Sequence, residues 1–261
     1  AEASGMQGAV NALFRGAKIN QSEGRAALHT SLRSPESANA PHSALVSETL
    51  ASLREFVDRV HSGAWTGYSG QTIDTVVNLG IGGSDLGPAM VVDALADFAL
   101  NRPRVRFVSN VDPAHLARTL KGLDPATTLF IVASKTFGTL ETLANARAAR
   151  DWLVAASDEA AVARHFVAVS ANIQAASDFG IEASNIFPLW DWVGGRFSLW
   201  SAIGLPIALG VGFAAFEELL GGAYAMDRHF ETAPLGENLP VVSALLAFWY
   251  RQYGASPSTT V

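Results

Sequence analysis

The chain has 261 residues, of which 49% are hydrophobic and 16% are charged, so it can bury a sizeable core. Eighteen basic and 24 acidic residues give a net charge of −6 without a basic block, which argues against a nucleic-acid partner. The sequence contains no cysteine, which excludes disulfides and thiolate metal sites and is compatible with a cytoplasmic location.

The first part of the chain predicts helices separated by polar loops. Residues 11–16 end a short apolar helix, and residues 19–33 form a polar loop that runs into a helical turn. Further on, apolar side chains recur at helical spacing at Val46, Leu50, Leu53, Val57 and Val60. This stripe is typical of an amphipathic helix, which we expect to end near residues 61–63.

From residue 73 onward, short apolar runs alternate with helical patterns. The runs predicted as strands are residues 73–79, 105–109, 129–133, 166–170 and 185–189. The predicted helices between them are residues 88–98, 113–120, 140–156 and 171–179. Strands and helices in strict alternation imply an α/β fold with a doubly wound parallel sheet. Such sheets bind ligands beyond the carboxyl ends of their strands.

The last part of the chain again predicts helices, over residues 199–209, 214–224 and 240–253. The stretch Phe197–Phe216 carries no charge and is long enough to cross a bilayer. Pro206 and several glycines within it favour a buried helix that is broken near Pro206, so we expect no membrane span. A single-span membrane protein is the less favoured interpretation.

These changes in pattern divide the chain into three predicted segments. Residues 1–66 form an N-terminal helical segment, residues 67–190 form the α/β domain, and residues 191–261 form a second helical segment.

The turn after the predicted strand 129–133 is equipped to bind an anion. Ser134, Thr136 and Thr139 supply three hydroxyls, and Lys135 supplies an ammonium group, directly before a predicted helix. A helix start offers unpaired N–H groups and the positive end of the helix dipole. Simple N-capping is the alternative, but one hydroxyl is enough for a cap. We therefore favour an anion site, and a phosphate site in particular.

A glycine-rich turn over residues 78–87 follows the first predicted strand. It does not match the dinucleotide-binding pattern because of Asp85, or the mononucleotide-binding pattern because of Pro88. It does not match the nucleophile elbow because of Leu86. What remains is a glycine-rich turn that presents Ser84. A ligand-binding turn and a bare tight turn explain this pattern equally well.

A third motif places two glycines directly before Arg196. The glycines let the backbone bend and aim the guanidinium, whose fixed charge suits a developing oxyanion. Taken alone, the motif favours an arginine paired with a structural carboxylate. The six histidines show no zinc-ligand spacing, so we expect no metal site.

The motifs together resemble a known family. The segments Asn78–Pro88 (NLGIGGSDLGP), Ser134–Asn145 (SKTFGTLETLAN) and Asp191–Leu205 (DWVGGRFSLWSAIGL) are similar, in this order, to segments of the glucose-6-phosphate isomerase (phosphoglucose isomerase) family. Two further segments, Lys18–Arg33 and Ser109–His115, also resemble the family. The resemblance covers nearly the whole chain.

The resemblance implies a sugar-isomerase (SIS-type) domain that holds the phosphate of glucose 6-phosphate or fructose 6-phosphate. The residues that it implies for the phosphate are Gly83, Ser84, Ser134, Lys135, Thr136 and Thr139. It also implies that Arg196 stabilises an enediolate and that Gly195 positions this arginine. Neither a metal nor an organic cofactor is implied. The family acts in glycolysis and gluconeogenesis, is cytoplasmic and is typically homodimeric.

The chain also departs from the family. Gly138 stands where the family usually has Thr, Ala17 replaces a usual Glu, and Pro113 replaces a usual Gly. Family members are much longer, and the resemblance places their catalytic glutamate, a ring-opening histidine and a second signature beyond residue 261. We therefore expect an N-terminal and central portion of such an enzyme, with little or no activity by itself. The alternative is a non-catalytic sugar-phosphate-binding SIS module, which has no evident need for Arg196.

Overall fold

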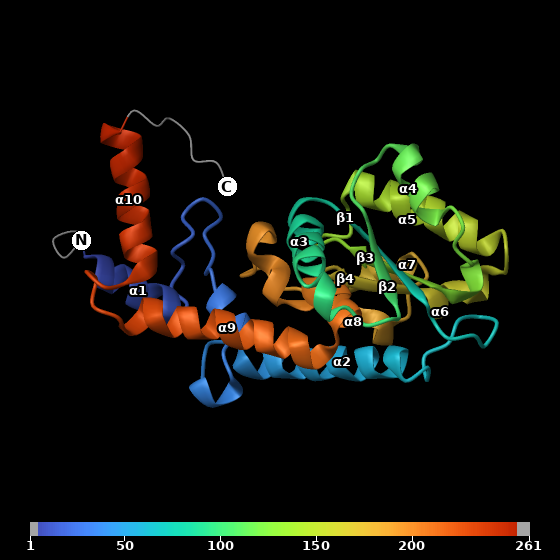
Figure 1. Cartoon of the computed structure of the whole chain (residues 1–261), viewed down its shortest axis with the longest axis horizontal. Coiled ribbons are helices and arrows are strands. Elements are labelled where there is room, and N and C mark those ends of the chain that lie inside the picture. The colour runs from blue at the N-terminus through green and yellow to red at the C-terminus, as the bar shows by residue number, and fades with distance from the viewer. Residues whose placement is uncertain (1–4, 255–261) are drawn as a thin grey trace.

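The computed structural model describes residues 5–254, so residues 1–4 and 255–261 of the predicted helical segments lie outside the described part. A parallel five-stranded sheet has helices on both of its faces (Figure 1). The strands are β1 (Thr75–Gly80), β2 (Arg104–Val108), β3 (Thr128–Ala133), β4 (Phe166–Ser170) and β5 (Ile186–Pro188). Each strand overlaps a predicted one, and the predicted α/β class with a doubly wound parallel sheet is confirmed.

Helices account for about half of the remaining described residues. They are α1 (Met6–Phe14), α2 (Ser43–His61), α3 (Leu86–Ala94), α4 (Pro113–Leu120), α5 (Leu140–Val154), α6 (Val162–His165), α7 (Ile173–Asp178), α8 (Leu205–Val211), α9 (Phe213–Thr232) and α10 (Leu239–Tyr253). No helix within residues 5–254 is long and apolar enough to cross a membrane.

Two predictions for the last part of the chain are wrong in detail. The expected helix 199–209 is instead a pair of 3₁₀ turns, Gly195–Trp200 and Ala202–Gly204, followed by α8. Pro206 lies in the first turn of α8, where its missing N–H group costs nothing, and therefore does not break a helix. The helix predicted over residues 214–224 continues as α9 to Thr232, because no further glycine or proline interrupts it before Pro234.

Side chains along each strand alternate between the two faces of the sheet, and both faces are buried. Val76, Ile131 and Val167 belong to a core shared with α2, α8 and α9, whereas Phe130 and Phe166 belong to a core shared with α4, α5 and α6. Helices from both flanking segments thus pack on the sheet. The division at residues 66 and 190 stays a prediction.

The winding of the sheet reverses between two neighbouring strands. The strand order is β2-β1-β3-β4-β5, so the chain moves to one side after β1 and to the other side after β3. Gly80 at the end of β1 is paired in register with Ala133 at the end of β3. The turns that follow these two strands therefore begin side by side at the reversal point, where doubly wound sheets bind their ligands.

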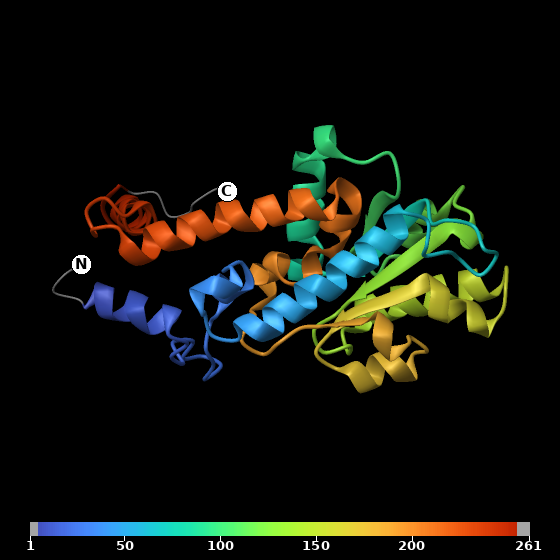
Figure 2. The ribbon, with the colours of Figure 1, turned by 90° about the horizontal axis from the view of Figure 1, so that it is seen from below.

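Helix α9 starts beside α2 and α8 and then extends away from the sheet towards α1 and α10 (Figure 2). A bidentate ion pair attaches it to the N-terminal part of the chain: Arg33 donates from Nε and Nη2 to the two carboxylate oxygens of Asp227, at 2.5 and 2.6 Å. The guanidinium of Arg33 also lies 4.9 Å from the ring centre of Trp200. Both charged side chains are largely buried, so the pair fixes the direction of α9.

Candidate functional site

Three loops lie beyond the carboxyl ends of the strands. The glycine turn (residues 81–85) follows β1, the hydroxyl turn (residues 134–139) follows β3, and the arginine loop (residues 191–197) comes after β5. These loops contain all of the predicted site residues.

The hydroxyls of the hydroxyl turn do not act as helix caps. Thr139 occupies the N-cap position of α5, but its side chain makes no capping hydrogen bond. Its Oγ1 lies 3.2 Å from Oγ of the buried Ser134 instead. The N–H groups of Leu140, Glu141 and Thr142, in the first turn of α5, have no acceptor among the described residues. Free donors thus remain at the positive end of the helix dipole.

The backbone of the hydroxyl turn exposes further donors. Phe137 has a φ of +49°, in the left-handed region, and its N–H group donates to the carbonyl of Ser134 at 3.1 Å. The N–H groups of Thr136, Gly138 and Thr139 have no acceptor within residues 5–254. Successive free N–H groups around a left-handed residue form the kind of concavity that binds anions.

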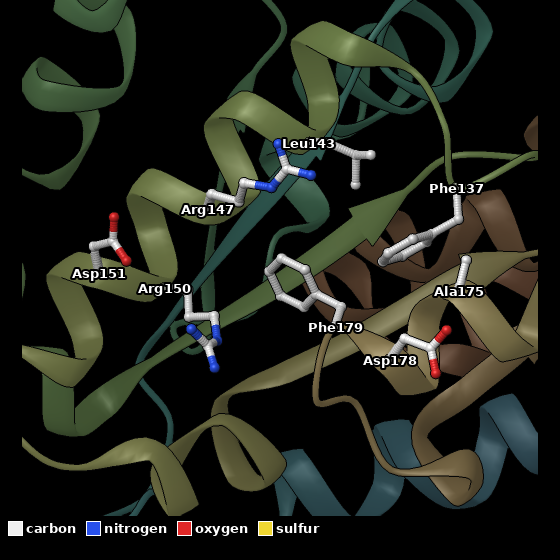
Figure 3. A pocket seen from close by; sticks show the side chains of 8 residues that line it. All are labelled: Phe137, Leu143, Arg147, Arg150, Asp151, Ala175, Asp178 and Phe179. Carbon is white, nitrogen blue, oxygen red and sulfur yellow. The ribbon is translucent and has the colours of Figure 1, made fainter.

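Phe137 anchors this turn from behind. Its ring is buried and lies 5.9 Å from the ring of Phe179, centre to centre. The two rings line a cavity of about 590 Å³, together with Arg147 and Arg150 of α5 (Figure 3). The anchor explains how a bulky residue keeps the left-handed conformation on which the turn depends.

The ammonium group of Lys135 lies against the arginine loop. Its Nζ donates to the carbonyl oxygens of Val193 at 2.9 Å and Asp191 at 3.2 Å. Burial lowers the pKa of Lys135, although the negative charge of Asp191 opposes this shift. Lys135 therefore belongs to the hydroxyl turn through its backbone and to the arginine loop through its side chain.

The glycine turn touches the arginine loop directly. A β-carbon placed on Gly83 would lie 1.9 Å from the carbonyl oxygen of Gly195, so only glycine fits at this position. The neighbouring Ser84 is partly exposed, and its carbonyl accepts a hydrogen bond from Nδ2 of Asn78 at 3.0 Å. The N–H groups of Gly82 and Gly83 have no acceptor among the described residues.

The side chain of Arg196 is exposed, and its guanidinium has neither a hydrogen bond nor an ion pair with any described residue. Its guanidinium carbon lies 5.1 Å from the ring centre of Phe197. The structural carboxylate partner that the motif alone favoured is thus not found within residues 5–254. A β-carbon on Gly195 would meet nothing within 4 Å, so the space in front of this residue is open.

His29 belongs to the site although no motif singled it out. Its Nε2 accepts the N–H group of Gly194 at 2.8 Å, and its ring lies 4.8 Å from that of Phe197. Burial lowers its pKa to about 4, and the charges of Arg33, Lys135 and Arg196 act in the same direction. The only signal in the sequence was its place within the segment Lys18–Arg33.

A cavity of about 380 Å³ opens beside Arg196, between the arginine loop and the N-terminal residues. Asn20, Glu23 and His29 line it on the N-terminal side. Within residues 5–254, no group of three His, Cys, Asp or Glu side chains could hold a metal ion. The arrangement supplies neutral donors for an anion and one unpaired cation next to them.

Comparison with known proteins identifies relatives over the whole chain. The family model described as phosphoglucose isomerase matches residues 1–261. Proteins named glucose-6-phosphate isomerase from Hahella chejuensis and Cupriavidus metallidurans are 52% and 55% identical over 100% and 99% of this chain, and the matches cover 48% and 49% of those proteins. A crystal structure of a glucose-6-phosphate isomerase from Chlamydia trachomatis is 33% identical, with a TM-score of 0.81 over 96% of this chain and 48% of that one. The chain spans about half the length of the curated relatives it matches.

Proposed function

Because the chain belongs to the phosphoglucose isomerase family, we propose that it supplies the phosphate site and the transition-state arginine of an enzyme that interconverts glucose 6-phosphate and fructose 6-phosphate. The observation that carries this proposal is the hydroxyl turn, whose hydroxyls and free N–H groups gather at the positive end of α5. Small anions bind at such helix ends.

The phosphate is held in this proposal by neutral donors from two neighbouring turns. The donors are the hydroxyls of Ser84, Ser134, Thr136 and Thr139 and the free backbone N–H groups of Gly83, Thr136, Gly138 and Thr139. A doubly charged phosphate ester exchanges its water shell for these donors, and the positive end of the α5 dipole stabilises its charge. Binding of this remote group then orients the reacting carbons.

Arg196 acts at the other end of the substrate. Isomerisation moves a proton between C2 and C1, and negative charge develops on the oxygens of these carbons. C1 and C2 are several bonds away from the 6-phosphate, so the stabilising cation must lie beyond the hydroxyl turn. The arginine loop meets this requirement because Gly195 lies against the glycine turn. The guanidinium of Arg196 is available to a substrate because it has no partner among the described residues. Removing such a donor typically costs about 10²–10³ in kcat.

The unpaired guanidinium also argues against a non-catalytic phosphosugar-binding module. Such a module needs the hydroxyl turn but gains nothing from a free cation at the distant carbons. The open space in front of Gly195 supports the same conclusion, because it leaves room for a substrate close to Arg196.

The proton-transferring base is proposed to lie outside this chain. Of the carboxylates in the three loops, Asp85 is buried, and Asp191 lies 3.6 Å from Arg25. The resemblance implies a glutamate in a segment that has no counterpart among residues 1–261. We therefore propose that the isolated chain binds sugar phosphates weakly and turns over little. A cytoplasmic homodimer is proposed for the longer enzyme on the same resemblance.

Calorimetric titration of the isolated chain tests this proposal. We expect fructose 6-phosphate to bind, inorganic phosphate to compete with it, and fructose to give no heat of binding. Equal binding of fructose and fructose 6-phosphate would contradict the phosphate site. A coupled assay in which the isolated chain isomerises fructose 6-phosphate rapidly would contradict the missing base.

A further inference from the structure

Two side chains from distant parts of the sequence hold the backbone of the arginine loop. Nζ of Lys135 donates to the carbonyl oxygens of Asp191 and Val193, and Nε2 of His29 accepts the N–H group of Gly194. The peptide group between Val193 and Gly194 is therefore held at both its carbonyl oxygen and its N–H group, and the peptide group after Asp191 is held at its carbonyl oxygen.

The loop needs such contacts because of its sequence. Gly194 and Gly195 separate these contacts from Arg196, and glycines restrict the backbone least. The loop is also outside regular secondary structure until the 3₁₀ turn that begins at Gly195. Without the two side chains, the point from which the guanidinium projects would be poorly defined, although catalytic groups must be held closely.

The chemistry of both groups suits a permanent contact. The ammonium of Lys135 has three N–H groups and uses two of them on the carbonyls. The imidazole of His29 can accept only while Nε2 carries no proton, and its environment holds the pKa at about 4. Nε2 of His29 is therefore unprotonated and can accept a hydrogen bond at neutral pH. The cations near His29 disfavour protonation of its ring.

We propose that Lys135 and His29 are positioning residues that clamp the arginine loop and aim Arg196, and that the Lys135 ammonium does not hold the phosphate. The clamp rests on the proposed function only for the task given to Arg196, since the contacts themselves are independent of any ligand. The competing interpretation places the Lys135 charge on the phosphate. The two interpretations predict opposite results when this charge is removed.

Amide hydrogen exchange of the 261-residue chain separates them. In Lys135→Met, the clamp predicts that the Gly194 amide exchanges more than about fivefold faster than in the unmutated chain, because local opening becomes easier. The free energy of unfolding in urea should fall by a comparable amount, about 1 kcal/mol for a fivefold change, because the same native contacts are lost. Lys121→Met is the matched control, since Lys121 is an exposed lysine at the end of α4 and belongs to none of the three loops. His29→Phe should accelerate Gly194 in the same way and keeps the inference testable if Lys135→Met folds poorly.

A second readout concerns the phosphate. Titration with inorganic phosphate should show that Lys135→Met weakens binding by less than about fivefold, which is smaller than the loss expected for a direct charged contact. Exchange at Gly194 that stays within about fivefold in both variants overturns the clamp. A larger loss of phosphate affinity in Lys135→Met overturns the assignment of its ammonium. If the unmutated chain binds no phosphate, the proposed phosphate site fails, and the exchange rates alone decide the clamp.

Discussion

Gly83 lies against the carbonyl group of Gly195, so closely that a β-carbon on Gly83 would be 1.9 Å from the oxygen. Each glycine belongs to a different motif, and the contact joins the turn after β1 to the arginine loop. This contact brings the glycine turn, which carries phosphate donors, next to the loop that carries the guanidinium. Two substitutions with opposite expected results follow from this contact.

We predict that Gly83→Ala destabilises the fold by about 1–3 kcal/mol, because the added methyl group forces the two backbones apart. Gly195→Ala is the matched variant: its methyl group meets open space, and its φ is not in the left-handed region, so stability should change little. Urea unfolding of both variants measures the difference. Equal free energies of unfolding would show that the close approach does not constrain the loops.

The hydroxyl turn predicts that removing one of its hydroxyls weakens ligand binding. Ser134→Ala removes a hydroxyl that lies 3.2 Å from Thr139, and with it a donor to the charged phosphate. A hydrogen bond to a charged group contributes about 1.5–3 kcal/mol, so fructose 6-phosphate should bind at least tenfold more weakly. Ser52→Ala, on the exposed side of α2, is the control. Calorimetric affinities that agree for both variants would remove Ser134 from the site.

The ion pair between Arg33 and Asp227 predicts a large effect on stability. Asp227→Asn leaves a largely buried guanidinium without its counter-charge, which should cost about 3–5 kcal/mol. Glu231→Gln breaks the exposed pair with Arg228 and should cost about 0–1 kcal/mol. Urea unfolding of the two variants provides the comparison. A similar cost for both would mean that the buried pair does not hold α9 in place.

His29 predicts a pH dependence of stability. Its pKa falls from 6.5 to about 4 on folding, so the unfolded chain binds more protons between these values. The contribution of His29 is complete above pH 6.5 and is lost as the pH falls towards 4. His29→Gln cannot titrate, and its free energy of unfolding should therefore fall less than that of the unmutated chain between about pH 7.5 and about pH 4.5. Parallel pH curves would contradict a depressed pKa.

Local sequence patterns predicted the sheet and the hydroxyl turn well. The run Leu129–Ala133 is apolar without alternation, as expected for a strand buried on both faces, and β3 contains it. The segment 166–170 coincides with β4 for the same reason. A concentration of hydroxyls before a helix likewise depends on neighbours in sequence. Such features depend on neighbouring residues only, and the structure contains these strands and this turn at the predicted residues.

The contacts between the loops could not be predicted, because they join residues far apart in the chain. We expected Lys135 at an anion site, and no local pattern indicates that the carbonyls of Asp191 and Val193 lie within reach of its ammonium. His29 carried no spacing signal, as its partner is the backbone of Gly194. The helix predicted over residues 214–224 is shorter than α9, which extends to Thr232.

The phosphate site itself is tested most directly by mapping fructose 6-phosphate on the chain by NMR. We expect the amide signals of residues 134–142 and 82–84 to shift on titration, and the N–H groups without a described acceptor to shift most. Shifts confined to other surfaces, such as the cavity lined by Arg147 and Arg150, would contradict it.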